Sequence, residues 1–324
     1  MFPTKILLAV DGSPESTRAA RVAGQLSGEL DSELHLVCVG SMLEGYTPWD
    51  WKVLDTGSLI QLRELAEEEA ETILEEQTQK VREADGEVAE THATIGRPKT
   101  EIVKLAEELD AGLVVLGSRG FGSLKRALLG SVSNGVVRHT HSSVLVVRGS
   151  GEGDQPPGRI LLAVDGSGEA AAAAEAAVEI SSATGSKLHV LSVLRSPYPG
   201  PETWDIGEER LKRVRRNVRT FVYGLSEQPT AEGGHIEEMH LAFGKPDKEI
   251  VALGERIEVD LVVIGSRGLS GARRALLGSV SDSVVRHAHC SVLVVRDAHS
   301  RRRSRSRGSR SLLSEISKPP ESQD

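Results

Sequence analysis

Apolar residues gather in short continuous runs that recur at matching places in the two halves of the chain. KILLAV (5–10) and RILLAV (159–164) come first, followed by ELHLVCVG (33–40) and KLHVLSVL (187–194). Continuous rather than alternating apolarity is typical of strands covered on both faces, as in a parallel sheet. Helix-like stretches separate the runs. The pattern predicts an α/β fold in which the unit β-α-β-α-β-α-β-α-β occurs twice, with helices on both faces of each sheet.

Turn residues and charge indicate where the remaining elements begin. Ser13-Pro14 is typical of an N-cap followed by a first-turn proline, which predicts a helix to about residue 30. Its alanine-rich counterpart, 169–183, is a strong helix former. The other expected elements are charged helices at 59–84 and 206–226, strands near 87–94 and 235–242, and helices at 99–109 and 247–257.

One stretch of 36 residues occurs twice, at 113–148 and 261–296, with 26 identical positions. Each copy is expected to form a strand, a glycine loop, a helix that begins at Gly-Ser, and a last strand. The shared glycine pattern is Gly117-x2-Gly120-x9-Gly130-Ser131 and Gly265-x2-Gly268-x9-Gly278-Ser279. A strand that ends in such a loop before a helix N-terminus directs backbone N–H groups and the helix dipole at one spot. The repeat therefore predicts two phosphate-binding loops.

Carboxylates are expected to face these loops. Asp11 and Asp165 follow the first strand of each half, and ligands of open α/β sheets bind at the carboxyl ends of strands where the strand order reverses. A carboxylate there suits ribose hydroxyls or a metal, although each Asp is equally placed to cap the following helix. Ser131 and Ser279 are expected to face phosphate. Neither loop matches a GxxxxGKS or a tight GxGxxG pattern, so a mononucleotide is favoured.

Charge and composition limit the other classes of partner. The chain has 324 residues and a net charge of −8, and its segment 301–310 holds six arginines, which leaves −8 − 6 = −14 for the rest. An acidic body repels nucleic acid and acidic membranes, so only the tail is suited to weak nucleic-acid binding. Two cysteines, Cys38 and Cys290, make no disulfide framework. No apolar run approaches the roughly 20 residues of a membrane span, so a cytoplasmic protein is expected.

The repeat and the composition predict the domain organisation. The expected parts are domain 1 at 1–148, a Gly/Pro-rich linker at 149–158, domain 2 at 159–296, and a disordered Arg/Ser-rich tail at 297–324.

Both halves resemble the universal stress protein domain. The ATP-binding subgroup of that family has G-x2-G-x9-G-(S/T) after its fourth strand and an Asp at the end of its first, as quoted above for both halves. The resemblance covers 3–148 and 158–296. It implies two tandem open parallel five-stranded sheets of order 3-2-1-4-5 with an adenine nucleotide alpha hydrolase-like fold. Family members often have proline before the last strand, where this chain has Ser143 and Ser291.

The resemblance also implies a ligand and its contacts. ATP, with Mg²⁺, would lie in each crevice, with ribose and metal contact from Asp11 and Asp165 and main-chain adenine contact from Val39 and Val193. The residues implied to contact phosphate are Gly117, Gly120, Gly130, Ser131 and Val132 in the first half, and Gly265, Gly268, Gly278, Ser279 and Val280 in the second. The two domains are expected to pair through their last strands, with a further homo-oligomer also open.

The expected function is an ATP-binding stress-response or regulatory module rather than a dedicated enzyme. No catalytic residue is assigned, because the repeated acids are already given to ribose or metal. The alternatives are a slow ATP hydrolase and a scaffold that binds no nucleotide and acts through domain pairing and its basic tail. A separate metal alternative rests on His139, His141, His287, His289 and Cys290, which would suit zinc if they met across paired domains.

Overall fold

The chain forms two compact units, Met1–Pro156 and Pro157–Asp324. The computed structural model describes residues 3–40, 56–120, 129–149, 157–194, 208–223, 236–269 and 277–297. The tail beyond 297 and most of the expected linker lie outside these residues, so the domain boundaries given above stay predictions.

The first unit alternates strands and helices. Its strands are β1 (Lys5–Val10), β2 (Glu33–Gly40), β3 (Glu90–Ile95), β4 (Leu113–Gly117) and β5 (Ser143–Val147). Its helices are α1 (Pro14–Glu29), α2 (Thr56–Arg82), α3 (Pro98–Glu108) and α4 (Ser131–His139). The third strand begins three residues later than the expected 87, and the other elements lie close to their predicted positions.

The second unit repeats this order. Its strands are β6 (Arg159–Val164), β7 (Lys187–Leu194), β8 (Ile236–Phe243), β9 (Leu261–Gly265) and β10 (Ser291–Val295). Its helices are α5 (Gly168–Thr184), α6 (Glu208–Tyr223), α7 (Pro246–Arg256) and α8 (Ser279–His287).

All strand pairs within each unit are parallel, and the order is β3-β2-β1-β4-β5 in the first and β8-β7-β6-β9-β10 in the second. This confirms the predicted α/β class with strand order 3-2-1-4-5. The first strand lies between the second and the fourth in both units. The chain therefore reverses direction across the sheet at this strand, which is where ligands of such sheets bind.

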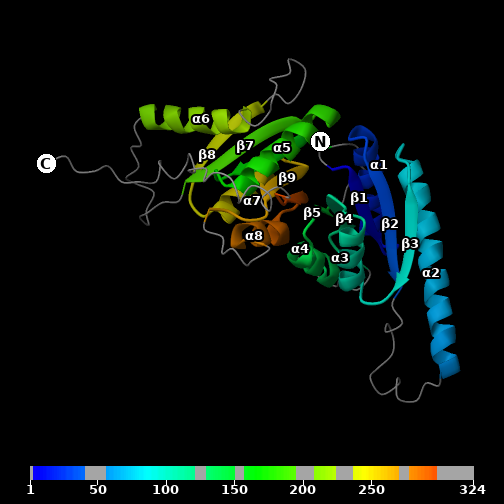
Figure 1. The fold of residues 1–324 in the computed structure, drawn as a ribbon. Coiled ribbons are helices and arrows are strands. Elements are labelled where there is room, and N and C mark those ends of the chain that lie inside the picture. The colour runs from blue at the N-terminus through cyan, green and yellow to red at the C-terminus, as the bar shows by residue number, and fades with distance from the viewer. Residues whose placement is uncertain are drawn as a thin grey trace. The chain divides into compact units, whose positions relative to one another are not determined.

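Two pairs of helices cover the sheet of the first unit. Helix α1 packs against α2 and against β1 and β4, whereas α3 packs against α4 (Figure 1). The central strands are buried on both faces: Ile6, Leu7 and Leu8 of β1 and Val114 and Val115 of β4 have no exposed surface. Continuous apolar runs are thus explained, because every side chain of a central strand meets a helix on one face or the other.

The first helix of each unit is capped as its sequence predicts. Ser13 Oγ accepts a hydrogen bond from Ser16 N at 3.2 Å, and Pro14 occupies the first turn. In the second unit Ser167 Oγ accepts from Ala170 N at 3.1 Å. Because a side-chain acceptor satisfies an orphan N–H group, each cap fixes the point where the chain leaves the first strand.

Cys38 is expected to resist alkylation in the native protein. Burial raises the pKa of its thiol to about 12, and the charges of Asp11 and Glu69 act in the same direction. At pH 8 only about 10⁻⁴ of such thiols are ionised, and the thiolate is the nucleophile. Iodoacetamide should therefore label Cys290, which is half-exposed, and leave Cys38 unmodified until urea unfolds the chain. Peptide mass spectrometry would show this, and rapid native labelling of Cys38 would contradict its burial.

Candidate functional site

The carboxyl ends of β1 and β4 bring an aspartate and a glycine loop together. Asp11 follows the last residue of β1, and Gly117 is the last residue of β4. The two strands pair directly, with Ala9 opposite Leu116. In the second unit Ala163 lies opposite Ile264, which puts Asp165 beside the loop that follows Gly265. Each of the two aspartates thus lies at the carboxyl end of the first strand, where the order of strands in the sheet reverses.

One oxygen of each aspartate caps the turn that enters the next helix. Oδ1 of Asp11 accepts hydrogen bonds from Ser13 N at 3.0 Å and Ser13 Oγ at 2.6 Å. Oδ1 of Asp165 accepts from Ser167 N at 3.0 Å. The capping role considered from the sequence is therefore present in both units.

The other oxygen of each aspartate faces the second glycine of the loop. A Cβ atom on Gly120 would collide with Oδ2 of Asp11, and one on Gly268 would lie 2.5 Å from Oδ2 of Asp165. Oδ2 of Asp165 also accepts a hydrogen bond from Leu269 N at 3.1 Å. Because a carboxylate oxygen accepts two hydrogen bonds, Oδ2 retains one lone pair for a ligand. Glycine at this position lets the loop backbone approach the carboxylate.

The glycine loop is closed at its base. In the first unit, Gly130 N donates to Ser118 O at 2.8 Å, and Ser118 N donates to Val147 O at 2.9 Å. The equivalent bonds in the second unit are Gly278 N to Ser266 O and Ser266 N to Val295 O, both at 2.7 Å. These bonds bring the start of the loop and the helix N-terminus to the same strand end.

Helix α4 presents its first N–H groups without a side-chain cap. Its N-cap is Gly130, which makes no side-chain hydrogen bond, and the same is true of Gly278 at α8. Asn134 N bonds Gly130 O at 2.9 Å, so the regular helical pattern begins there. The N–H groups of Ser131 and Val132 precede that bond at the positive end of the dipole. In contrast to α1 and α5, which have serine caps, these helix ends have no side-chain acceptor among the described residues for their first N–H groups.

The first glycine of each loop serves packing. A Cβ atom on Gly117 would lie 2.9 Å from the backbone carbon of Glu15 and 3.0 Å from its carbonyl oxygen. On Gly265 it would lie 2.8 Å from the backbone carbon of Glu169. Real Cβ atoms do not approach backbone this closely, so glycine is required for α1 and α5 to lie against the strand end. The predicted phosphate contact of these two glycines stays a prediction.

The first arginine of each loop forms an ion pair. Arg119 contacts Glu15 at 3.1 Å, and Arg267 contacts Glu169 at 2.5 Å. Burial, and then the charge of Arg267, lowers the pKa of Arg296 to about 10, which still leaves it protonated at neutral pH. Arg267 and Arg296 thus both lie near the carboxyl ends of β9 and β10, with the charge of Arg267 balanced by Glu169.

The two valines assigned to adenine belong to β2 and β7, at positions just past the point where these strands stop pairing with β1 and β6. The pairing of β1 with β2 ends at Val10 and Cys38, and the pairing of β6 with β7 ends at Val164 and Ser192. Val39 and Val193 come next and are half-exposed. On the side that faces β1 or β6, the backbone groups of Val39 and Val193 therefore have no strand partner opposite them in the described part of the chain. This is compatible with main-chain contact to a ligand.

Two buried serines that the sequence reasoning did not select join the helix to the strand end. Ser133 Oγ donates to Gly117 O at 2.8 Å, and Ser281 Oγ donates to Gly265 O at 2.7 Å. They hold the N-terminus of α4 and α8 at the loop. The signal that could have found them is the triplet Ser-Val-Ser, which occurs at 131–133 and again at 279–281.

The alternative set of histidines makes individual contacts. His139 Nδ1 bonds Gly135 O at 2.7 Å, His287 Nδ1 bonds Ser283 O at 2.7 Å, and His289 Nε2 contacts Glu255 at 2.7 Å. Within the described residues, groups of three or more metal-ligand side chains occur elsewhere, at His35, Glu90 and His92 and at their counterparts in the second unit.

Comparison with known proteins decides the family. The sequence model of the universal stress protein family matches residues 3–148 and 157–296. The chain belongs to the universal stress protein family. A Staphylococcus haemolyticus protein of that name is 37% identical over 140 residues, which cover 42% of this chain and 83% of the relative. The family match in both halves confirms a tandem universal stress protein.

Solved structures of universal stress proteins have the same fold. One from Archaeoglobus fulgidus is 27% identical, covers 91% of this chain and 99% of its own, and superposes with a TM-score of 0.64. One from Pseudomonas aeruginosa covers 90% and 93% at 21% identity with a TM-score of 0.60, which bears on the fold alone. Among the described residues no helix of this universal stress protein combines the length and apolarity of a membrane span.

Proposed function

We propose that each half of this universal stress protein binds ATP in the crevice between its first and fourth strands, as a nucleotide-dependent regulatory module. The observation that carries the proposal is that the backbone at Gly120 and at Gly268 lies so near Oδ2 of Asp11 and of Asp165 that a Cβ atom there would collide with it. A carboxylate suited to ribose hydroxyls thus faces a glycine loop whose helix is suited to phosphate. Both parts are needed for a nucleotide, and both occur twice.

The phosphate groups would lie against the uncapped helix ends. Backbone N–H groups of Ser131 and Val132 in the first unit, and of Ser279 and Val280 in the second, precede the first regular helical bond. The positive end of the dipole and the N–H groups together stabilise an anion there. Gly130 and Gly278 leave the approach free of a side chain.

Mg²⁺ would be held with the nucleotide. The residues fit a hard cation, because Asp11 and Asp165 supply carboxylate oxygens after the first strand of each unit, and Ser131 and Ser279 supply hydroxyls at the start of α4 and α8. When bound, the ion would neutralise charge on the phosphates. Oδ1 of each aspartate remains committed to its turn, so Oδ2 is the oxygen that would contact ribose or the ion.

The purified protein is expected to carry adenine nucleotide. Denaturing the chain and separating the released material by anion-exchange chromatography should give close to two nucleotides per chain. ATP would support a binding module, whereas ADP would shift the function toward slow hydrolysis. If none is released and calorimetric titration with ATP and Mg²⁺ also gives no binding, the proposal is wrong and the scaffold alternative takes its place.

Three further expectations stay predictions for this chain. They are the pairing of the two domains through their last strands, a homo-oligomer beyond that pairing, and weak nucleic-acid binding through the arginine-rich tail. A cytoplasmic location is likewise a prediction.

A further inference from the structure

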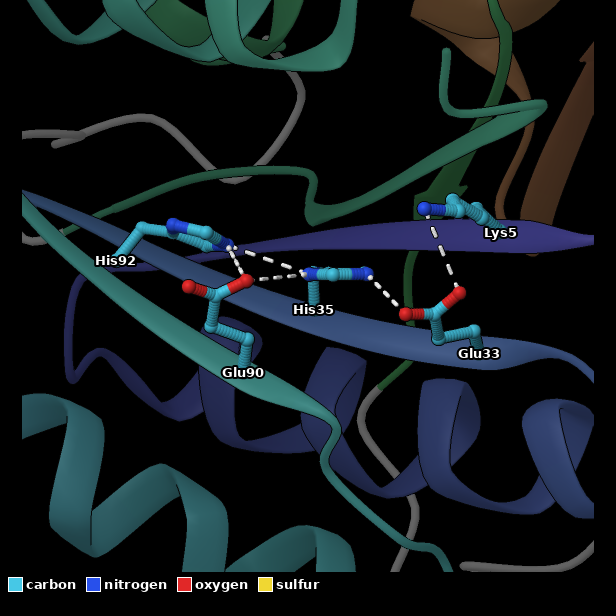
Figure 2. A network of polar contacts seen from close by, with 5 residues as sticks. All are labelled: Lys5, Glu33, His35, Glu90 and His92. Carbon is cyan, nitrogen blue, oxygen red and sulfur yellow. Dashed lines mark hydrogen bonds and ion pairs between the residues drawn. The ribbon is translucent and has the colours of Figure 1, made fainter. Parts of the chain in front are cut away.

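Two histidines and a glutamate converge on the edge of the first sheet, far from the proposed nucleotide crevice. His35 Nδ1 lies 3.3 Å from His92 Nε2 and 3.8 Å from Glu90 Oε2, and His92 Nε2 lies 3.7 Å from that same oxygen. The parallel register places His35 opposite Glu90, and Val37 opposite His92. Figure 2 shows the three side chains pointing toward one another from β2 and β3.

These distances suit a tetrahedral metal. Zn²⁺ binds histidine nitrogen at about 2.0–2.1 Å and carboxylate oxygen at about 2.0–2.2 Å, which separates tetrahedral ligand atoms by about 3.3 Å. Small rotations of the exposed Glu90 side chain would bring the longer separations to this value. We propose that His35, Glu90 and His92 form a site for Zn²⁺ or a similar divalent transition metal, with the fourth position open to solvent.

A second carboxylate orients the buried histidine. His35 is buried, and its Nε2 lies 3.2 Å from Glu33 Oε1, while Glu33 Oε2 lies 3.5 Å from Lys5 Nζ (Figure 2). If Nε2 donates its proton to Glu33, Nδ1 carries the lone pair that a metal requires. Such carboxylate–histidine pairs commonly support metal ligands and raise their basicity.

The same group recurs in the second unit. His189, Glu238 and His240 bring their ligand atoms within 4.8 Å of one another, and His189 Nδ1 lies 3.3 Å from His240 Nε2. The spacing of the two rings is also the same, with centroids 5.5 Å apart in both units. Repetition of both histidines and the acid at matched strand positions argues for a shared role rather than a chance contact.

The surroundings differ in a way that predicts unequal affinities. Lys187, two residues before His189, occupies the place that Glu33 has before His35. Lys187 and His189 line a cavity of about 300 Å³ that also contains Arg159 and Arg256. Glu237 and Glu258 also line this cavity and pair with Lys187 at 3.2 Å and with Arg159 at 3.7 Å. The difference between the units is therefore the carboxylate of Glu33, which contacts the buried histidine of the first unit, whereas a lysine stands at that position in the second. The first site is therefore expected to bind more tightly.

The hydrogen-bond geometry of the two rings is compatible with metal binding. If His35 Nε2 donates to Glu33, His35 Nδ1 accepts a hydrogen bond from His92 Nε2 in the metal-free chain. A metal would replace that shared proton, with His92 protonated on Nδ1 instead.

The position indicates what the metal would do. His35 is near the amino end of β2 and Val39 near its carboxyl end, about 13 Å apart at strand spacing. β3 is the edge strand of its sheet, and a metal would join it to β2. Zinc would stabilise this edge without touching the nucleotide crevice, which separates the two proposals.

Zinc counting on the full chain, without a histidine tag, tests the site. Protein stripped with EDTA and dialysed should compete with a chromophoric chelator for two Zn²⁺ per chain. His92→Gln should remove the tighter one, His240→Gln the weaker one, and the double variant both. Glu33→Gln should weaken the tighter site by about 10–100-fold, as expected for a residue that orients a ligand.

Two exposed histidines outside the clusters provide the matched control. His141→Gln combined with His289→Gln should leave both zinc ions in place. Circular dichroism and a thermal melt in EDTA would verify that each variant is folded. The proposal is overturned if the wild-type chain takes up no zinc, or if zinc persists in the folded double variant of His92 and His240.

Discussion

ATP with Mg²⁺ is expected to raise the unfolding temperature of the wild-type chain, and Gly130→Glu together with Gly278→Glu is expected to abolish the rise. A ligand that binds only the native state stabilises it by about 2.7 kcal/mol at a concentration 100 times Kd. For units of this size that corresponds to roughly 5–10 °C. A thermal melt at increasing ATP concentration would measure the shift.

The glutamate introduced at Gly130 or Gly278 is expected to block phosphate binding by its negative charge and by its volume. Gly130 and Gly278 are the N-caps of α4 and α8, so a side chain there projects toward the first N–H groups of the helix. Its carboxylate would compete with phosphate for those groups and repel it. The backbone of Gly130 has φ −61°, which any residue adopts, so the substitution does not require a glycine conformation.

The same substitution at a glycine outside the proposed site is the control for a general effect of the added charge and volume. Gly28 is exposed near the end of α1, and a Cβ atom there would meet only Asp85 O, at 3.8 Å. Gly28→Glu should retain the full ATP shift. Each single variant at Gly130 or Gly278 should retain part of it, because one site remains. A full shift in the folded double variant would show that the phosphate site is wrongly placed.

Gly117→Ala is expected to destabilise the first unit by about 1–3 kcal/mol, the usual cost of overpacking. The added methyl would lie 2.9–3.0 Å from backbone atoms of Glu15 at the start of α1, and backbone cannot move aside as a side-chain end does. Gly265→Ala should have the same effect on the second unit, where the contact is with Glu169. Urea unfolding followed by circular dichroism would measure the loss.

The control for this effect again uses Gly28. Gly28 lies in a helix, where an added Cβ atom would make only an ordinary contact with Asp85 O at 3.8 Å, so Gly28→Ala should stabilise the protein by about 0.5–1 kcal/mol. Unchanged stability of Gly117→Ala would mean that α1 can move away from the strand end. Combined with the ATP melt, this variant separates the packing role of the first loop glycine from any contact with phosphate.

The order of the strands and helices, and the places where the glycine loops begin and end, were predictable because they depend on local patterns. Continuous apolar runs indicated the central strands, and Ser13-Pro14 indicated the cap that the structure shows. The spacing of Gly117, Gly120 and Gly130 indicated a loop with a helix behind it. A repeat inside one chain strengthened each of these inferences, since the same pattern occurs at equivalent places.

The partners of side chains were less predictable. Arg119 forms an ion pair with Glu15, which is 104 positions earlier in the chain. Asp11 was open between a ligand and a cap, and one of its oxygens makes the capping bonds while the other faces Gly120. Such outcomes depend on which loops meet at the strand ends, and no local pattern contains that information.

The histidine clusters show this limit most clearly. His35 and His92 each sit in an ordinary strand sequence, and the metal alternative considered from sequence rested on other histidines. Only the register of β2 with β3 brings His35 Nδ1 to within 3.3 Å of His92 Nε2. The sequence by itself determined the two α/β units, their strands and their glycine loops, because apolar periodicity and turn residues act locally. The tertiary structure alone decided which distant side chains meet, because strand order and register set those contacts.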